Sequence, residues 1–106
     1  MYVFNKTKNC LISDKVEVAK TFKEKSEGLL KYETSHAMYF ETRWGIHTYG
    51  MKFPIDVIVL DEDNTAKKIK KDMKPGRFFF WNPKYKRVLE LPIGSDVEEN
   101  DVLETV

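Results

Sequence analysis

The segment Phe53–Leu60 constrains the fold of this chain more than any other stretch of its sequence. Phe53 precedes Pro54, which biases Phe53 toward extended backbone geometry, and a proline is tolerated where a strand begins. Ile55 and every second residue after it share one face, and the opposite face is apolar except for Asp56. A strand with two apolar faces needs cover on both sides. We therefore predict that this segment forms a central strand of a sheet.

Further strands are predicted where apolar and polar residues alternate between turn residues. These segments are Tyr2–Asn5, Cys10–Ile12, Lys15–Ala19, His36–Phe40, Tyr85–Leu91 and Val102–Val106. Residues 65–73 follow an acidic turn. The spacing of their apolar residues also fits a helix, but the position after a tight turn favours the second strand of a hairpin. Residues 41–49 are expected to form a loop.

One helix is predicted over about residues 22–31. Thr21 and Glu24 have the spacing of a capping box, in which each side chain accepts a backbone N–H of the other residue. Apolar residues of this segment fall on one helical face. Together with the strands, the helix predicts an α+β fold, with one domain over residues 1–106. Its mostly antiparallel sheet is expected to be barrel-like or sandwich-like, and 106 residues bury a core without disulfide staples.

Charge is spread unevenly along the chain, although the formal net charge is only +1. Residues 67–87 hold nine Lys or Arg side chains and one acid, Asp72. Residues 88–106 hold six acids and no Lys or Arg. The acidic tail either neutralises the basic stretch within the fold or leaves it to an external partner, and mixed charged faces are ordinary on protein surfaces.

Several kinds of site and location are not expected from this sequence. Cys10 is the only cysteine, so no intrachain disulfide or Cys-based metal site is expected, and Cys10 itself fits a small buried residue. No apolar run approaches the ~20 residues of a membrane span. Residues 1–6 lack the order of a signal peptide, so we expect a cytoplasmic protein. His36 and His47 are the only histidines, no metal-ligand spacing is recognisable, and no cofactor is expected.

The loop before the central strand combines polar and aromatic residues, and it is the first candidate for a functional site. A charge on the apolar face at Asp56 costs several kcal/mol unless it is paired or hydrogen-bonded. Asp56 is either an anchor that holds the loop 41–52 through backbone N–H groups or a carboxylate at the floor of a pocket. If Asp56 lies at the floor of a pocket, we expect a small binding or accessory protein whose ligand is a small molecule. Its expected lining is Trp44, His47, Met51, Asp56 and Trp81.

An enzyme is the second functional hypothesis. It would use Asp56 and His47 in acid/base chemistry on a small molecule. Alternation along the strand 85–91 places Glu90 opposite its two leucine neighbours, so its carboxylate is a third candidate if it reaches the same cavity. Pairing of Glu90 with a nearby arginine is the alternative.

Binding of single-stranded nucleic acid through residues 67–87 is the third hypothesis. Aromatic side chains interleaved with cations stack bases and hold phosphates. In the run Arg77–Trp81 we expect the rings mainly in the core, distributed between the two faces of a strand. Trp81 and Tyr85 are expected to stay partly exposed.

Five segments together resemble a conserved family known as domain of unknown function 192, also called uncharacterised protein family 0127, over roughly residues 16–106. The segments are Glu27-Gly-Leu-Leu30, Ala37-Met-Tyr-Phe40, His47-Thr-Tyr-Gly-Met-Lys-Phe-Pro-Ile-Asp56, Val59-Leu-Asp61 and Val88-Leu-Glu-Leu-Pro-Ile-Gly94. They are similar to the family's Arg-Gly-Leu-Met, Gly-Met-Leu-Phe and Trp/Phe-Met-Lys/Arg-x-x-x-Ile-Asp motifs and to its Val-Leu-Glu-Leu-Pro-Ala-Gly block. The resemblance implies a compact, mostly β, α+β domain, and it implies no established substrate, cofactor or catalytic residue.

Overall fold

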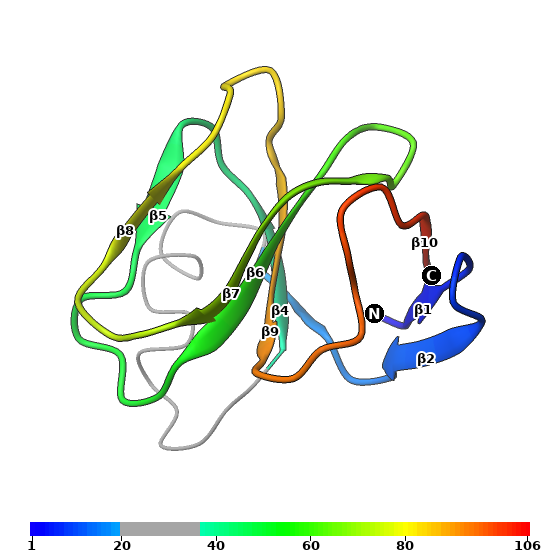
Figure 1. The fold of residues 1–106 in the computed structure, drawn as a ribbon, viewed down its shortest axis with the longest axis horizontal. Coiled ribbons are helices and arrows are strands. Elements are labelled where there is room, and N and C mark those ends of the chain that lie inside the picture. Colours follow the sequence, from blue (N-terminus) through cyan, green and yellow to red (C-terminus); the bar gives the residue numbers. More distant parts are fainter. Residues whose placement is uncertain (20–36) are drawn as a thin grey trace.

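The structure, a computed structural model, describes residues 1–19 and 37–106 (Figure 1). The described strands form three sheets. The first has the order β10 (Leu103–Thr105), β1 (Val3–Asn5), β2 (Cys10–Ser13). The second has the order β3 (Glu17–Val18), β4 (Met38–Glu41), β9 (Arg87–Pro92), β6 (Ile55–Leu60), β7 (Ala66–Met73). The third is a two-stranded ribbon of β5 (Gly45–His47) and β8 (Phe78–Phe80).

The five-stranded sheet is the middle layer of the described structure. Figure 1 shows the β5–β8 ribbon on one side of it and the three-stranded sheet on the other. Neighbouring strands pair in antiparallel fashion, except that β3 lies parallel to β4. The sheet can therefore bury both of its faces.

The predicted α+β class is wrong for the residues that the structure describes. None of them lies in a helix, and the sheets are open rather than closed into a barrel. The five-stranded sheet ends at β3 and β7, and no described strand joins these two edges to close a ring. The predicted helix over residues 22–31 lies outside the described residues. No described helix is long and apolar enough to cross a membrane.

The central strand is confirmed. All six residues of β6 are buried, because β9 and β7 flank it and the other two sheets cover its faces. Ile55, Val57 and Val59 belong to one apolar cluster, and Ile58 and Leu60 belong to another. Full burial of each such side chain stabilises the fold by about 1.5–3 kcal/mol.

Each apolar cluster lies between the five-stranded sheet and one of its neighbours. The first cluster joins Ile58 and Leu60 to Val3 and Leu103 of the three-stranded sheet. The second cluster joins β6 to Phe79 of the β5–β8 ribbon. The ribbon is therefore held by its inner side chains, and its outer side chains stay available.

Two weaker predictions have different outcomes. Residues 66–73 form strand β7, as predicted, because pairing with β6 overrides the helical spacing of their apolar residues. The loop expected over residues 41–49 is wrong in part, because residues 45–47 form β5. The sequence signal for β5 is weak since only one residue of this strand, Ile46, is a large apolar residue.

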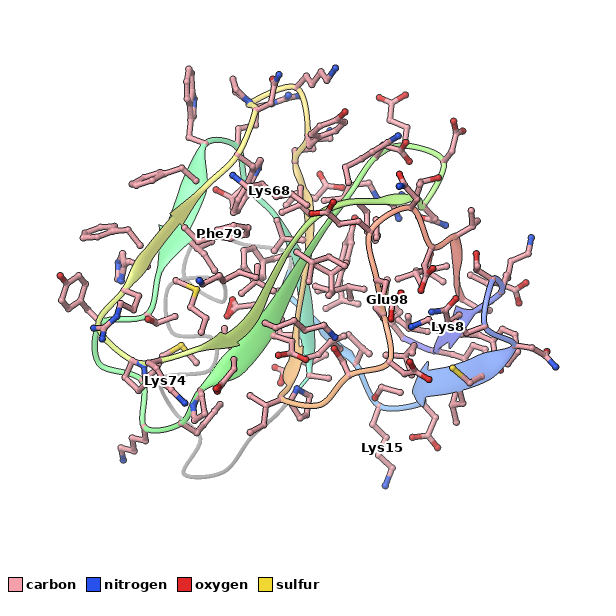
Figure 2. All side chains as sticks on the ribbon, viewed as in Figure 1. Lys8, Lys15, Lys68, Lys74, Phe79 and Glu98 are labelled. Atoms are coloured by element: carbon pink, nitrogen blue, oxygen red, sulfur yellow. The ribbon has the colours of Figure 1, made fainter. Side chains whose placement is uncertain are left out.

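The acidic tail makes its ion pairs with the N-terminal region. Lys8 lies 3.0 Å from the carboxylate of Asp96, 3.1 Å from that of Glu98 and 3.8 Å from that of Asp101. Figure 2 shows Lys8 beside Glu98, between the three-stranded sheet and the segment that follows β9. No ion pair among the described residues joins the tail to residues 67–87. The tail therefore does not neutralise the basic stretch through ion pairs, which was one of the two expectations.

Candidate functional site

Asp56 is a structural anchor with its hydrogen-bonding capacity in use. It is 1% exposed and accepts hydrogen bonds from the backbone N–H of Asp72 (2.8 Å) and from the N–H (2.9 Å) and hydroxyl (2.6 Å) of Ser95. The ammonium of Lys71 lies 3.5 Å away. Burial alone raises the pKa of Asp56, but these hydrogen bonds and the charge of Lys71 outweigh it and hold the pKa below its ordinary value.

A β-bulge explains why Asp56 finds these donors. Ile55 pairs with Met73 and Val57 pairs with Lys70, so two residues of β7 lie opposite the single residue Asp56. The extra residue leaves the N–H of Asp72 outside the strand ladder, and the carboxylate accepts it. The expected anchoring of loop 41–52 is therefore wrong, because Asp56 ties β6 to the bulge and to the turn after β9 instead.

Asp56 and Glu90 lie on opposite faces of the sheet. In the register between β6 and β9, Asp56 pairs with Leu91, and Glu90 pairs with the next residue, Val57. Paired residues share a face and consecutive residues alternate. These two carboxylates therefore do not converge on one cavity, so Glu90 does not join Asp56 as the third acid/base candidate.

Glu90 is a buried acid among apolar neighbours. Its strand partners are Met38 on β4 and Val57 on β6. Burial raises the pKa of Glu90 from 4.5 to about 8, so the neutral acid is the main form at neutral pH. Because Glu90 faces the second apolar cluster, its carboxyl group keeps its proton in the folded chain.

The five residues predicted to line a pocket lie in three separate places. Met51 and Trp81 are buried together in the second apolar cluster, and the indole N–H of Trp81 donates to the Tyr85 carbonyl (2.9 Å). Asp56 lies on the other face of the sheet. His47 and Trp44 are exposed on the β5–β8 ribbon and its entry. The partial exposure expected for Trp81 is wrong, and that expected for Tyr85 is confirmed.

Exposed aromatic side chains gather on the β5–β8 ribbon and at its two ends, and we call them the aromatic surface. Its members are Trp44, His47, Tyr49, Phe78 and Phe80. Phe78 and Phe80 are nearly parallel, with ring centroids 5.8 Å apart, and Tyr49 meets Phe78 edge-on at 5.3 Å. The ring of His47 lies 6.1 Å from that of Phe78.

The aromatic surface follows from strand alternation. Phe79 points inward and is 8% exposed, so its two neighbours Phe78 and Phe80 point outward and are 58% and 61% exposed. The expected distribution of this run between two faces is confirmed. The expectation that its rings lie mainly in the core is wrong for Phe78 and Phe80. In Figure 2 Phe79 lies on the inner side of β8, next to Lys68.

Close backbone contacts hold the ribbon in shape. Gly45 pairs with Phe80, and a Cβ on Gly45 would lie 2.5 Å from the Phe79 carbonyl oxygen and 2.6 Å from the Phe80 ring. Thr48 is fully buried, and its hydroxyl donates to the Lys74 carbonyl (2.7 Å) and accepts the N–H of Arg77 (2.9 Å). The rings are therefore displayed on a fixed support.

Trp44 begins the ribbon in a strained conformation. Its φ is +78°, a left-handed value that costs a non-glycine residue about 1–2 kcal/mol. Its carbonyl accepts the N–H of Trp81 (2.9 Å), and the N–H of Gly45 donates to the Arg43 carbonyl (3.0 Å). These bonds hold an indole that is 67% exposed. Strain retained at an exposed aromatic residue is a pointer to function.

The segments that carry the aromatic surface are basic. Residues 42–53 and 73–81 contain Arg43, Lys52, Lys74 and Arg77 and no Asp or Glu. Lys68 reaches across from β7, donates to the Phe80 carbonyl (2.6 Å) and lies 5.1 Å from the centre of the Phe79 ring. Asp72 is the nearby acid of β7, and Lys74 pairs with it at 2.8 Å.

The family model of domain of unknown function 192 (DUF192), described as an uncharacterized ACR, matches residues 3–103 of the chain. The chain belongs to this family. The resemblance seen in the sequence motifs is therefore confirmed. DUF192 proteins are uncharacterised, so membership assigns no ligand or reaction to any of the residues above.

Two curated relatives also carry the name of an uncharacterised family. A UPF0127 protein of Pyrococcus abyssi is 32% identical over 98 residues, which are 87% of this chain and 83% of the relative. A UPF0127 protein of Thermococcus sibiricus is 33% identical over 99 residues, which are 87% of this chain and 64% of the relative.

Two crystal structures share the DUF192 fold described above. A Sinorhizobium meliloti protein described as a candidate transcription regulator has a TM-score of 0.77 and 20% identity, and the match covers 97% of this chain and 89% of that one. A Novosphingobium aromaticivorans protein of unknown function has a TM-score of 0.80 and 18% identity, with 98% and 82% covered. At these identities the likeness concerns the fold alone.

Metal chemistry has no candidate ligand set in the part of this DUF192 chain that the structure describes, since no group of three or more His, Cys, Asp or Glu side chains there is arranged to hold an ion. Sequence reasoning missed Tyr49 as a site candidate, and it included Phe78 and Phe80 only within the stretch 67–87, with their rings expected mainly in the core. The run of three Phe carried the signal, because a strand cannot turn three consecutive side chains to one face.

Proposed function

We propose that this DUF192 protein binds single-stranded nucleic acid through the aromatic surface. The observation that carries the proposal is the set of exposed rings on two segments that contain four cations and no carboxylate. Base–aromatic stacking contributes about 1–3 kcal/mol per base, and Lys or Arg side chains beside the rings hold the phosphates. Both halves of that chemistry are carried by the two segments that form the β5–β8 ribbon and its ends.

Exposure of the rings supports a partner on this surface. Monomeric proteins rarely leave several large aromatic side chains exposed side by side, and such patches mark interaction sites. Phe78 and Phe80 are more than half exposed, although Phe79 between them shows that this strand also packs a core. The strained backbone at Trp44, at the entry to the same ribbon, adds a second, independent pointer to function.

The small-molecule pocket predicted from the sequence has less support. Its five residues do not surround one cavity, and Asp56 already accepts three short hydrogen bonds within the fold. The acid/base hypothesis loses support for the same reason, since His47 is exposed on the ribbon and Asp56 is buried within the five-stranded sheet. The ligand-binding role predicted for each residue stays a prediction.

The test is fluorescence anisotropy with labelled single-stranded DNA and RNA of mixed sequence. We expect binding at low salt, and Phe80→Ala should weaken it about tenfold because one stacked base is lost. Leu11→Ala is the matched control, because Leu11 is a 51% exposed side chain of the three-stranded sheet, which lies on the other side of the molecule. Equal losses in the two variants would contradict a specific surface.

Salt dependence gives a second measurement. If about four cations neutralise phosphates, affinity for a single strand should fall about fiftyfold between roughly 50 and 200 mM salt, because binding releases counterions. Arg77→Gln should reduce this slope, whereas Lys15→Gln, next to the N-terminal sheet, should not. Absence of binding to any oligonucleotide at low salt, or binding only to acidic peptides or anionic vesicles, overturns the proposal.

A further inference from the structure

A cleft of about 360 Å³ lies between the turn that follows β6 and the segment that precedes β9. Both segments project from the same end of the five-stranded sheet, at the top of Figure 1. The volume falls within the range of small-molecule sites in proteins. Tyr85, which is half-buried, contributes an aromatic ring to its lining.

Opposite charges come from the two segments that flank the cleft. The turn after β6 contributes three carboxylates, those of Asp61, Glu62 and Asp63. The segment before β9 contributes Lys84, Lys86 and Arg87. Arg43, at the entry to the β5–β8 ribbon, adds a fourth cation. The lining is therefore rich in both signs of charge.

No ion pair joins the cations of this cleft to its carboxylates. Lys86 pairs instead with Glu41 (3.6 Å), and Lys84 lies over the Tyr85 ring at 5.1 Å. The side-chain oxygen of Asp61 accepts the N–H groups of Asp63 and Thr65 (both 2.9 Å) within its own turn. The charged side chains of the two segments therefore do not pair with each other, although both segments line the same small cleft.

Arg87 holds a fixed position at the cleft without a carboxylate partner of its own. Its Nε donates to the Tyr39 hydroxyl (3.0 Å), and its terminal nitrogen donates to the Asp61 carbonyl (3.1 Å). Both acceptors are neutral oxygens, and the Tyr39 ring lies 5.6 Å away. A half-buried guanidinium oriented in this way is ready to bind an anionic group.

We propose that this cleft binds a zwitterionic small molecule of the free amino acid class. The ligand's carboxylate would lie at the cations around Arg87, its ammonium at Glu62 and Asp63, and an apolar side chain against Tyr85. A simple anion would leave the carboxylates of the turn after β6 without a ligand partner, and a simple cation would leave the basic side chains without one. A ligand with both charges satisfies both segments.

This inference does not depend on nucleic-acid binding, because its lining lies outside the aromatic surface. Arg43 is close to both sites, so it is left unchanged in the test. Three probes that share the leucine side chain isolate the two charges. L-leucine carries both, N-acetyl-L-leucine lacks the ammonium, and L-leucinamide lacks the carboxylate.

The measurement is a ¹H–¹⁵N NMR titration of the full chain, with each probe taken to about 10 mM. L-leucine should shift the amide resonances of residues 61–63 and 84–87. The affinity of each derivative should be lower by about tenfold or more, because each leaves the charged side chains of one segment without a partner on the ligand. L-phenylalanine is the second zwitterion and should shift the same resonances.

Two variants and two controls complete the test. Glu62→Gln/Asp63→Asn should weaken the binding of L-leucine and leave that of N-acetyl-L-leucine unchanged. Lys84→Ala should also weaken the binding of L-leucine, but it should leave that of L-leucinamide unchanged. Glu99→Gln and Lys15→Ala, which lie outside the cleft lining, should change nothing. Absence of shifts with both zwitterions overturns the proposal, and so does equal binding of L-leucine and N-acetyl-L-leucine.

Discussion

Ser95 donates both its backbone N–H (2.9 Å) and its hydroxyl (2.6 Å) to the carboxylate of Asp56, which lies 39 residues earlier in the chain. This pair joins the central strand to the turn after β9. It turns the one charge of an otherwise apolar strand into a link between distant segments. The acid that first suggested a reactive site is therefore a structural element of this chain's fold.

Asp56→Asn should destabilise the protein by about 2–4 kcal/mol. An amide group cannot accept all the donors that converge on the carboxylate, and buried N–H groups of Asp72 and Ser95 would lose partners. Urea unfolding followed by circular dichroism measures the change. Asp72→Asn is the control, because the Asp72 side chain pairs only with exposed Lys74, and it should change stability by about 0.5 kcal/mol or less. Similar effects of the two variants would contradict the anchor.

The same anchor predicts acid sensitivity. The pKa of Asp56 is held below its ordinary value in the folded chain, so its contribution to stability is complete above that ordinary value, about 3.8. The contribution is lost as the pH falls through the folded pKa. The stability difference between wild type and Asp56→Asn should therefore shrink in this acidic range. A difference that stays constant from pH 6 down to about pH 2 would argue against it.

Glu90 predicts the opposite trend at higher pH. Its pKa rises from 4.5 to about 8 on folding, so between these values the folded chain keeps a proton that the unfolded chain has released. Stability should therefore fall as the pH rises, by up to about 1.4 kcal/mol per pH unit. Glu90→Gln imitates the neutral acid, so its stability should be flatter from pH 5 to 8 and exceed that of wild type at pH 8. Parallel pH profiles of the two proteins would refute this.

Gly45→Ala should disturb the aromatic surface through sterics alone. The added Cβ would meet the fixed Phe79 carbonyl oxygen at 2.5 Å, so we expect a loss of about 1–3 kcal/mol and weaker oligonucleotide binding. Gly94→Ala is the contrast, because Gly94 has open space around it but a φ of +84°. It should cost about 1 kcal/mol through backbone strain and leave oligonucleotide binding unchanged. Equal binding losses in both variants would point to general unfolding.

Cys10 should react slowly with thiol reagents. Burial raises the pKa of its thiol, and the Asp96 carboxylate, 3.7 Å from the sulfur, raises it further. Less thiolate is present at pH 8 than in a free cysteine, and the thiolate is the reactive form. A colorimetric thiol assay should show slower labelling of the folded than of the unfolded chain. Asp96→Asn should speed labelling of the folded chain, and an unchanged rate would contradict the role of Asp96.

The sequence by itself determined the local elements of the middle layer. A run of β-branched residues after Pro54 predicts a strand, and two apolar faces predict cover on both sides, because burial of apolar surface drives folding. The alternation in the Phe run likewise predicts that Phe78 and Phe80 share one face and Phe79 the other, but not which of the two faces is buried. These conclusions need only the period of a strand, which each segment carries within itself.

Only the tertiary structure decided which side chains meet. The register between β6 and β9 separates Asp56 from Glu90, and a shift by one residue would have brought them to the same face. The partners of Asp56 depend on a bulge in β7 and on the distant residue Ser95. The exposed rings came together because β5, whose sequence signal is weak, pairs with β8. Pairing between strands is a long-range choice that depends on the whole core, so local patterns do not contain it.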